Sequence, residues 1–275
     1  LLRLPSLASD WAYGFTPILD RFGVDLMVTQ AKLRGLVGRN KEIERMEIVL
    51  SRDTEDNVLL IGDKGVGRRT VVLQLAKHIA EGRVPPRLKH KRVVELSLTA
   101  LVGDSASPVD SEQKIERVMT EAVHAGNIIV VIPAIDRFLS DRDGRIDVSP
   151  VFDRMLTGHS VQVIGITTRT EYEKYLRPNS TVGKLFELVE VLPPTREEAI
   201  EILERFTDGV ERERHFFVTF AAIKTAVDTS DRYMTDIPFP EKAIDLLDET
   251  IASATTAHAR VVAAAIGSRE ELELA

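Results

Sequence analysis

The chain has 275 residues, of which 44% are hydrophobic and 29% are charged, and its formal net charge at pH 7 is −7. This balance is typical of a soluble globular protein with room for one large or two medium domains. The absence of cysteine excludes disulfides, thiolate nucleophiles and cysteine-ligated metals, and the negative net charge argues against a broad nucleic-acid surface.

The sequence carries no pattern for a membrane or a secreted location. No apolar run of about 18 residues or more occurs, so no membrane-spanning helix is expected. The first residues, Leu1–Pro5, lack the pattern of a signal peptide. The six histidines are scattered, with no i,i+4 pair beside a glutamate. We therefore expect a cytoplasmic protein with no membrane partner, no nucleic-acid partner and no metal ligands.

Residues 1–32 are expected to form an N-terminal extension that is too short to bury a core of its own. Its segment Asp10–Pro17 is interpreted as a loop because Gly and Pro interrupt any regular period. The extension carries four aromatic residues: Trp11, Tyr13, Phe15 and Phe22. Aromatic side chains at this density need a surface to cover, so we expect them to pack against the following domain. The alternative is an interface with another subunit.

From Gly38 onward, helical and strand patterns alternate. The first helix is predicted over Asn40–Ser51, with apolar residues on one stripe. Apolar strands are predicted at Asn57–Ile61, Val93–Leu98, Asn127–Ile132 and Val161–Thr167, and helices at Arg69–Ala80, Asp110–Ala125 and Pro150–Leu156. Strands that are apolar throughout are buried on both faces. The sequence therefore predicts an α/β domain over residues 33–192, with a parallel sheet covered by helices.

After Val191 the strand patterns stop. Helices are predicted over Thr195–Phe206, Phe216–Thr229 and Pro240–Ala257. Pro193-Pro194 is interpreted as a hinge, because proline ends regular structure at the residue before it. We expect a small all-helical domain over residues 193–254. Residues 255–275, Ala-rich and then acidic, are interpreted as the start of a following segment.

A glycine-rich turn joins the predicted strand Asn57–Ile61 to the helix that follows it. Gly62 and Gly67 have the spacing of a phosphate-binding loop, GxxxxGK[ST], and Gly65 lies between them. Such glycines let backbone N–H groups converge on phosphate oxygens at a helix N-terminus. The lysine position holds Arg68, and the Mg²⁺-binding hydroxyl position holds Arg69, which offers no oxygen ligand. The alternative is a coincidental glycine-rich turn.

A basic cluster follows at Arg87, Lys89, His90, Lys91 and Arg92. No aromatic residues are interleaved with it, as stacking on nucleic-acid bases would require. It is interpreted as a solvated loop, and a contact with a phosphate backbone is the alternative.

Several stretches, in chain order, resemble the first AAA+ module of the ClpA, ClpB and ClpC-type unfoldases. They are Leu19–Leu26, Leu36–Ile43, Asn57–Gly62, Ala125–Ile129, Ile164–Thr168 with Glu171-Tyr172, Ser230–Asp236 and Pro240–Glu249. The resemblance covers most of the chain. It implies an AAA+ P-loop fold, a large α/β domain followed by a small helical lid domain, with ATP or ADP bound between them.

The resemblance also implies which residues contact nucleotide. The phosphates would meet Gly62, Asp63, Lys64, Gly65, Val66, Gly67, Arg68 and Arg69. The adenine would meet Val37, Gly38, Ile202 and Leu203, and a sensor threonine would be Thr167 or Thr168. Lys64, Arg68 and Arg69 add three cations to a helix N-terminus, so an anion site is expected.

The residues that hydrolyse ATP in the family are replaced. The Walker B carboxylate pair becomes Pro133 and Ala134, neither of which accepts a proton. One arginine-finger cation remains as Lys184, and the pore-loop aromatic is absent from Ala106–Val109. Asp136 lies nearby, but its expected role is to cap a helix or turn. No catalytic residue is therefore predicted.

Three functions remain open at this point. The first is a degenerate module that binds nucleotide weakly and largely without Mg²⁺, impaired in hydrolysis and acting as a regulatory or assembly scaffold. Its partners would be other AAA+ subunits or modules, in a homo- or hetero-oligomer such as a hexameric ring, together with protein clients or regulators. The second is an active ATP-dependent unfoldase with atypical catalytic residues. The third is a protein-interaction module with an empty pocket.

Overall fold

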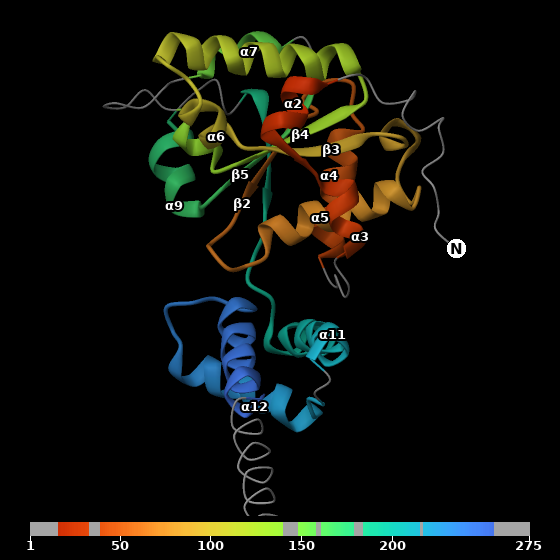
Figure 1. Cartoon of the computed structure of the whole chain (residues 1–275), viewed down its shortest axis with the longest axis vertical. Helices are drawn as coiled ribbons and strands as arrows, with labels where there is room; N and C mark the ends of the chain where they lie inside the picture. Colours follow the sequence, from red (N-terminus) through yellow and green to blue (C-terminus); the bar gives the residue numbers. More distant parts are fainter. Residues whose placement is uncertain are drawn as a thin grey trace, which may run out of the picture. The chain divides into compact units, whose positions relative to one another are not determined.

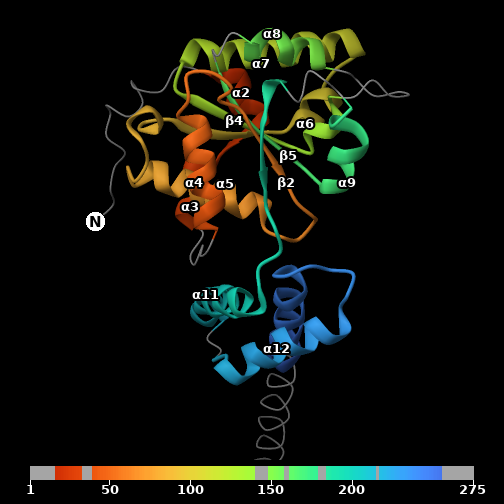
Figure 2. The ribbon, with the colours of Figure 1, turned by 180° about the vertical axis from the view of Figure 1, so that it is seen from behind.

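The computed structural model describes residues 16–32, 39–139, 148–157, 161–178, 184–214 and 217–255. These described residues divide into two compact units, of which the first ends at Leu192 and the second begins at Pro193. Figures 1 and 2 show both units from opposite sides. Within these residues, no helix combines the length and apolar character needed to span a bilayer.

The first unit is built on a six-stranded sheet in the order β1-β3-β4-β5-β2-β6. The strands are β1 (Gly23–Asp25), β2 (Val58–Ile61), β3 (Arg92–Leu96), β4 (Ile128–Pro133), β5 (Gln162–Thr167) and β6 (Glu187–Glu190). Strands β3, β4, β5, β2 and β6 are parallel. Strands β2 and β5 are buried along their whole length, as continuous apolar strands between two helical layers must be. The predicted parallel sheet is confirmed for these five strands.

The sixth strand adds an antiparallel edge to the predicted parallel sheet. Strand β1 pairs antiparallel with β3, so the sheet is mixed, and this edge comes from residues 1–32, interpreted from the sequence as an N-terminal extension. Three residues are too few to show a strand period in the sequence. Arg92 on β3 holds this edge with hydrogen bonds to Asp25 at 2.7 Å and Asp20 at 2.6 Å.

Helices cover both faces of the sheet (Figures 1 and 2). One face carries α3 (Leu26–Lys32), α4 (Asn40–Leu50) and α5 (Arg68–Ala80); the other carries α2 (Pro17–Phe22), α6 (Leu98–Gly103), α7 (Pro108–Ala125) and α8 (Ser149–Thr157). Short helical turns occur at η1 (Pro86–Leu88), η2 (Ile135–Arg137), α9 (Arg169–Glu171) and η3 (Tyr172–Leu176). The predicted stripe of α4 is confirmed, because Ile43, Met46, Val49 and Leu50 are buried.

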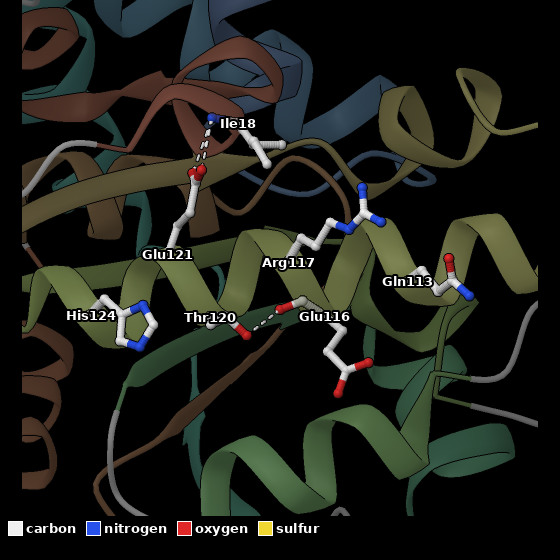
Figure 3. Close-up of a pocket in the computed structure, with 7 residues that line it drawn as sticks. All are labelled: Ile18, Gln113, Glu116, Arg117, Thr120, Glu121 and His124. Carbon is white, nitrogen blue, oxygen red and sulfur yellow. Dashed lines mark hydrogen bonds between the residues drawn. The ribbon is translucent and has the colours of Figure 1, made fainter.

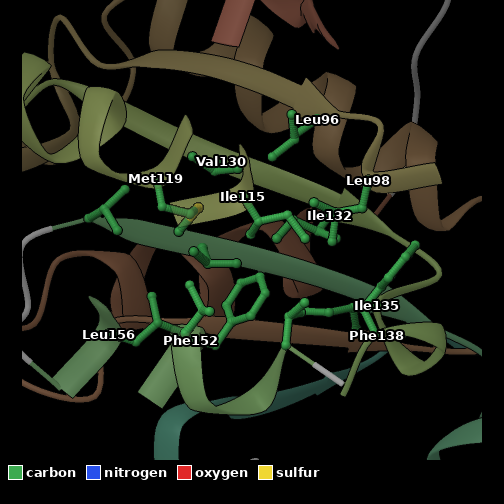
Figure 4. Packing of buried hydrophobic residues seen from close by; sticks show 14 of the residues in the cluster. Leu96, Leu98, Ile115, Met119, Val130, Ile132, Ile135, Phe138, Phe152 and Leu156 are labelled. Atoms are coloured by element: carbon green, nitrogen blue, oxygen red, sulfur yellow. The ribbon is translucent and has the colours of Figure 1, made fainter. Parts of the chain in front are cut away.

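The main hydrophobic core lies between the sheet and the helices on one of its faces, among them α7 and α8. Figure 4 shows side chains from β4, α7 and α8 packed together, among them Val130, Met119 and Phe152. The predicted packing of the N-terminal segment is confirmed for Phe22, which lies against this core. The other three aromatics, Trp11, Tyr13 and Phe15, lie outside the described residues.

The second unit is helical, as predicted. Its described helices are α11 (Arg196–Arg214), α12 (Phe220–Tyr233) and a further helix over residues 241–255. They enclose a separate core that includes Leu203, Ile223, Val227 and Leu247. This unit therefore has apolar contacts that can hold it together by itself.

Candidate functional site

The glycine-rich loop lies at the edge of the sheet where the parallel strands β2, β4 and β5 end. Residues 62–67 follow β2 directly, and the register places Ile61 beside Thr167 at the end of β5. Pro133, the last residue of β4, lies beside Ile166. Ligands of open α/β sheets bind outside such carboxyl ends, and here three segments distant in sequence meet.

The loop has the backbone of an anion-binding cradle. Gly67 precedes α5 with φ 92° and ψ 27°, a left-handed conformation that favours glycine, and no side chain caps this helix. The first N–H groups of α5 are therefore left for another acceptor. At Gly62, an added Cβ would lie 2.5 Å from the carbonyl oxygen of Val191, so the chain can approach β6 only with glycine there.

The three cations near the loop have different surroundings. Lys64 is exposed, and Arg68 is half-buried at the first turn of α5. Arg69 instead donates two hydrogen bonds to the Glu95 carboxylate of β3, at 2.8 and 3.2 Å. Its guanidinium is thus held by a bidentate ion pair, which leaves Lys64 and Arg68 as the cations available to an anion in the loop.

Arg68 is opposed by two carboxylates. Burial lowers the pKa of the Arg68 guanidinium below its ordinary value, and the charges of Asp136 and Asp63 partly offset that shift. The guanidinium nevertheless stays charged at neutral pH, because an arginine starts from so high a pKa.

Asp136, for which the sequence predicted a role as a helix or turn cap, lies inside the short helix η2 and is only 4% exposed. The N-cap residue of η2 is Ala134, which forms no side-chain cap. The Asp136 carboxylate accepts a hydrogen bond from the Thr167 hydroxyl at 2.7 Å, and Thr167 is 1% exposed. The spacing of residues along the chain could not show this pair. The two partners are 31 positions apart and lie on different elements, η2 and β5. A carboxylate three residues beyond the end of the apolar strand β4 was the available signal.

Comparisons with known proteins agree with this geometry. The model of the ATPase family associated with various cellular activities (AAA) matches residues 58–191, and the model of the AAA lid domain matches residues 195–273. The chaperone protein ClpB of Oceanobacillus iheyensis is 39% identical over 238 residues, which are 85% of this chain and 29% of that protein. The chain belongs to the Clp-type AAA+ family.

Other relatives support the same family. The negative regulator of genetic competence ClpC/MecB of Bacillus subtilis is 37% identical over 85% of this chain and 29% of its own length. The solved complex of Saccharomyces cerevisiae Hsp104 with casein has a TM-score of 0.81 and 25% identity, over 88% of this chain and 42% of that one. This AAA+ module thus spans less than a third of the length of these curated relatives.

Two residues at the end of β4, Pro133 and Ala134, align with the carboxylate pair that the family resemblance implies. Neither of them carries a carboxylate. Pro133 is the exposed last residue of the strand, and Ala134 follows in a left-handed conformation with φ 49°. A pyrrolidine ring and a methyl group can neither ligate a metal nor accept a proton. The nearest carboxylate along the chain, Asp136, is paired with Thr167.

Two further positions were singled out from the sequence, Lys184 and the segment Ala106–Val109. Lys184 is exposed. The segment Ala106–Val109 is the start of α7 rather than a free loop: the Ser107 hydroxyl accepts the Asp110 N–H at 3.2 Å, and the Asp110 carboxylate accepts the Ala106 N–H at 2.9 Å. This reciprocal cap explains why α7 begins at Pro108, two residues before the predicted start.

The remaining predicted nucleotide contacts are placed only in part. Val37 and Gly38 lie outside the described residues. Leu203 is completely buried within the lid core, and Ile202 is half-buried. The Thr168 hydroxyl accepts the Glu171 N–H at 3.1 Å and so caps α9. Ile202 therefore has more free surface for a ligand than Leu203.

A separate hollow of about 410 Å³ lies along α7 (Figure 3). Its wall carries Glu121, whose carboxylate accepts the N–H groups of Ile18 and Leu19 at 3.0 Å each and so holds the start of α2. This arrangement is structural, because the carboxylate is used within the fold.

Proposed function

We propose that this chain is a nucleotide-binding module of a Clp-type chaperone or unfoldase that is impaired in ATP hydrolysis and acts as a regulatory or assembly scaffold. The observation that carries this proposal is the end of β4, where Pro133 and Ala134 stand in place of the carboxylate pair. A positioned base contributes about 10²–10⁴-fold to the rate, so turnover without one is negligible.

The phosphate loop supports binding of ADP or ATP. The uncapped N–H groups at the start of α5 and the cations Lys64 and Arg68 suit phosphate oxygens. The same site does not suit Mg²⁺: Arg69 offers no oxygen, and Pro133 and Ala134 offer no carboxylate. Binding is therefore weak and depends little on Mg²⁺.

An active unfoldase is the second candidate, and Asp136 is the observation that favours it. This buried carboxylate lies near the carboxyl ends of the parallel strands. Its negative charge raises the pKa of Arg68. Against this role, the carboxylate accepts the Thr167 hydroxyl and offsets the charge of Arg68. Both interactions engage the carboxylate within the protein.

The partners follow from the family. Hsp104 was solved in complex with casein, and ClpB is a chaperone protein. By analogy, this cytoplasmic module assembles with other AAA+ subunits or modules, for example in a hexameric ring, and acts on protein clients or regulators. Nucleic acid and membranes are not among its partners.

Calorimetric titration with ADP and ATP, with and without Mg²⁺, tests the binding part of the proposal. We expect weak binding that changes little when Mg²⁺ is removed. An absence of binding heat with either nucleotide would instead favour an interaction module with an empty pocket.

Phosphate release tests the loss of hydrolysis. The native chain should release no phosphate, whereas a variant with Arg69→Thr, Pro133→Asp and Ala134→Glu should gain Mg²⁺-dependent turnover. The same variant with Arg68→Ala added is the control and should lose that gain. Mg²⁺-dependent turnover by the native chain, abolished by Arg68→Ala or Asp136→Asn, would overturn the proposal.

A further inference from the structure

Arg39 connects three segments of the first unit. It directly precedes α4, and its side chain is only 10% exposed. One terminal nitrogen, Nη1, donates to the carbonyl of Leu192 at 2.6 Å and to the Glu42 carboxylate at 3.1 Å. The other, Nη2, donates to the carbonyl of Val66 at 2.7 Å. The planar fork of the guanidinium lets its two terminal nitrogens donate to different carbonyls.

The contact with Val66 bears on the phosphate loop. In a trans peptide the carbonyl and the following N–H point in opposite directions. When Arg39 holds the Val66 carbonyl, it therefore fixes the direction of the Gly67 N–H on the far side of the same peptide plane. That N–H belongs to the residue that opens the cradle of α5.

The contact with Leu192 bears on the linker, because Leu192 is the last residue of the first unit and Pro193 begins the second. The same stretch touches the phosphate loop directly. The Val191 N–H donates to the carbonyl of Ile61 at 2.7 Å, and the Val191 carbonyl occupies the place where a Cβ at Gly62 would lie. The loop and the start of the linker are thus neighbours, and Arg39 bridges them.

The backbone conformation of Arg39 is energetically unfavourable for a residue with a side chain. Its φ of 64° and ψ of 20° are left-handed, a conformation that non-glycine residues adopt rarely. Such residues persist where the surrounding contacts over-determine them, and they cluster at functional positions. Here the three acceptors of the guanidinium are those contacts.

We propose that Arg39 is a positioning residue that orients the Gly67 amide of the phosphate loop and couples the state of that loop to the Leu192–Pro193 linker. The coupling to nucleotide rests on the proposed function. The clamp itself exists without nucleotide and can be measured separately.

Hydrogen–deuterium exchange on the full chain without nucleotide tests the clamp. Arg39→Lys keeps the charge but loses the planar fork that reaches both carbonyls. Exchange should therefore accelerate together, by roughly tenfold, at Val71, whose N–H donates to the Gly67 carbonyl, and at Val191, whose N–H donates to the Ile61 carbonyl. Arg39→Gly, which accepts the left-handed backbone, should give the same result without strain. Arg45→Lys is the matched control on the same helix: Arg45 pairs with Glu187 and does not touch the loop.

Adding ADP tests the coupling. In the native chain ADP should slow exchange at both Val71 and Val191, and in Arg39→Lys at Val71 alone. Exchange at these two amides within twofold of the native rate in both Arg39 variants would overturn the clamp, and so would a uniform increase across the whole first unit. If ADP does not bind the native chain, the proposed function fails while the nucleotide-free measurement still decides the role of Arg39.

Discussion

Glu187, at the start of β6, contacts two arginines from elsewhere in the first unit. Its carboxylate pairs with Arg45 on α4 and accepts a hydrogen bond from Arg52 at 3.3 Å. Partial burial alone would raise the pKa of Glu187, but the hydrogen bonds and charges of the two arginines hold it below its ordinary value of 4.5. A carboxyl group with a depressed folded pKa stabilises the fold above its unfolded pKa and loses that contribution as pH falls through the folded value.

We therefore expect a pH-dependent effect of Glu187→Gln. At about pH 7 it should lower the free energy of unfolding by about 0.5–1 kcal/mol, as for partly exposed ion pairs. The difference from the native chain should shrink below about pH 4.5 and vanish once Glu187 is protonated in both states. Urea unfolding across this range measures it, with Glu249→Gln, an exposed glutamate, as control. A difference that stays constant with pH would contradict the ion-pair explanation.

Individual site residues were predictable where the information is local. The spacing of Gly62 and Gly67 indicated the cradle, and both glycines have the expected surroundings. The partners of Arg69 and Asp136 were not predictable: Glu95 and Thr167 come from other strands. Parallel strands are joined by long crossover connections. Which residues become neighbours therefore depends on the register between strands, and the spacing of residues along the chain does not show that register.

Among the elements, α2 is the clearest case of a helix held by tertiary contacts. It has six residues and no side-chain cap of its own, but Glu121 on α7 accepts the N–H group of Ile18 (Figure 3) and that of Leu19. A helix this short is not stable by itself. Periodicity in the sequence therefore did not predict these elements, although residues 17–32 form two helices and the edge strand β1.

Removing the carboxylate of Glu121 should loosen this segment. Glu121→Ala leaves two N–H groups without their acceptor and should cost about 1–3 kcal/mol, confined to α2 and β1. Hydrogen exchange at Ile18 and Leu19 should accelerate, while exchange along β4 stays unchanged. Thr120→Ala, on the next position of α7, is the control. Equal effects of both variants would show that the contact is not specific.

At the scale of the whole molecule, the two units have separate cores. The lid core contains Leu203, and the first unit buries Leu75 on the inner side of α5. Because the two cores are distinct, a cavity in one should affect the stability of that unit first.

This independence can be measured with a reciprocal pair of variants. Leu203→Ala should destabilise the second unit by about 2–5 kcal/mol, and Leu75→Ala should do the same for the first. Limited proteolysis should then cleave within residues 196–255 for the former and within residues 39–192 for the latter. If either variant exposed both units equally, the chain would unfold as one cooperative body.

The sequence by itself determined the fold class, the glycine spacing after β2, the identities of Pro133 and Ala134 at the end of β4, and the change to helices after Pro193-Pro194. These features depend on local periodicity, on glycine spacing and on residue identity, which a single chain displays directly. Only the tertiary structure decided that Arg69 turns to Glu95, that Asp136 pairs with Thr167, and that Arg39 bridges Val66 and Leu192. Those contacts join residues that are between 26 and 153 positions apart, and only the packed sheet brings them within hydrogen-bond distance.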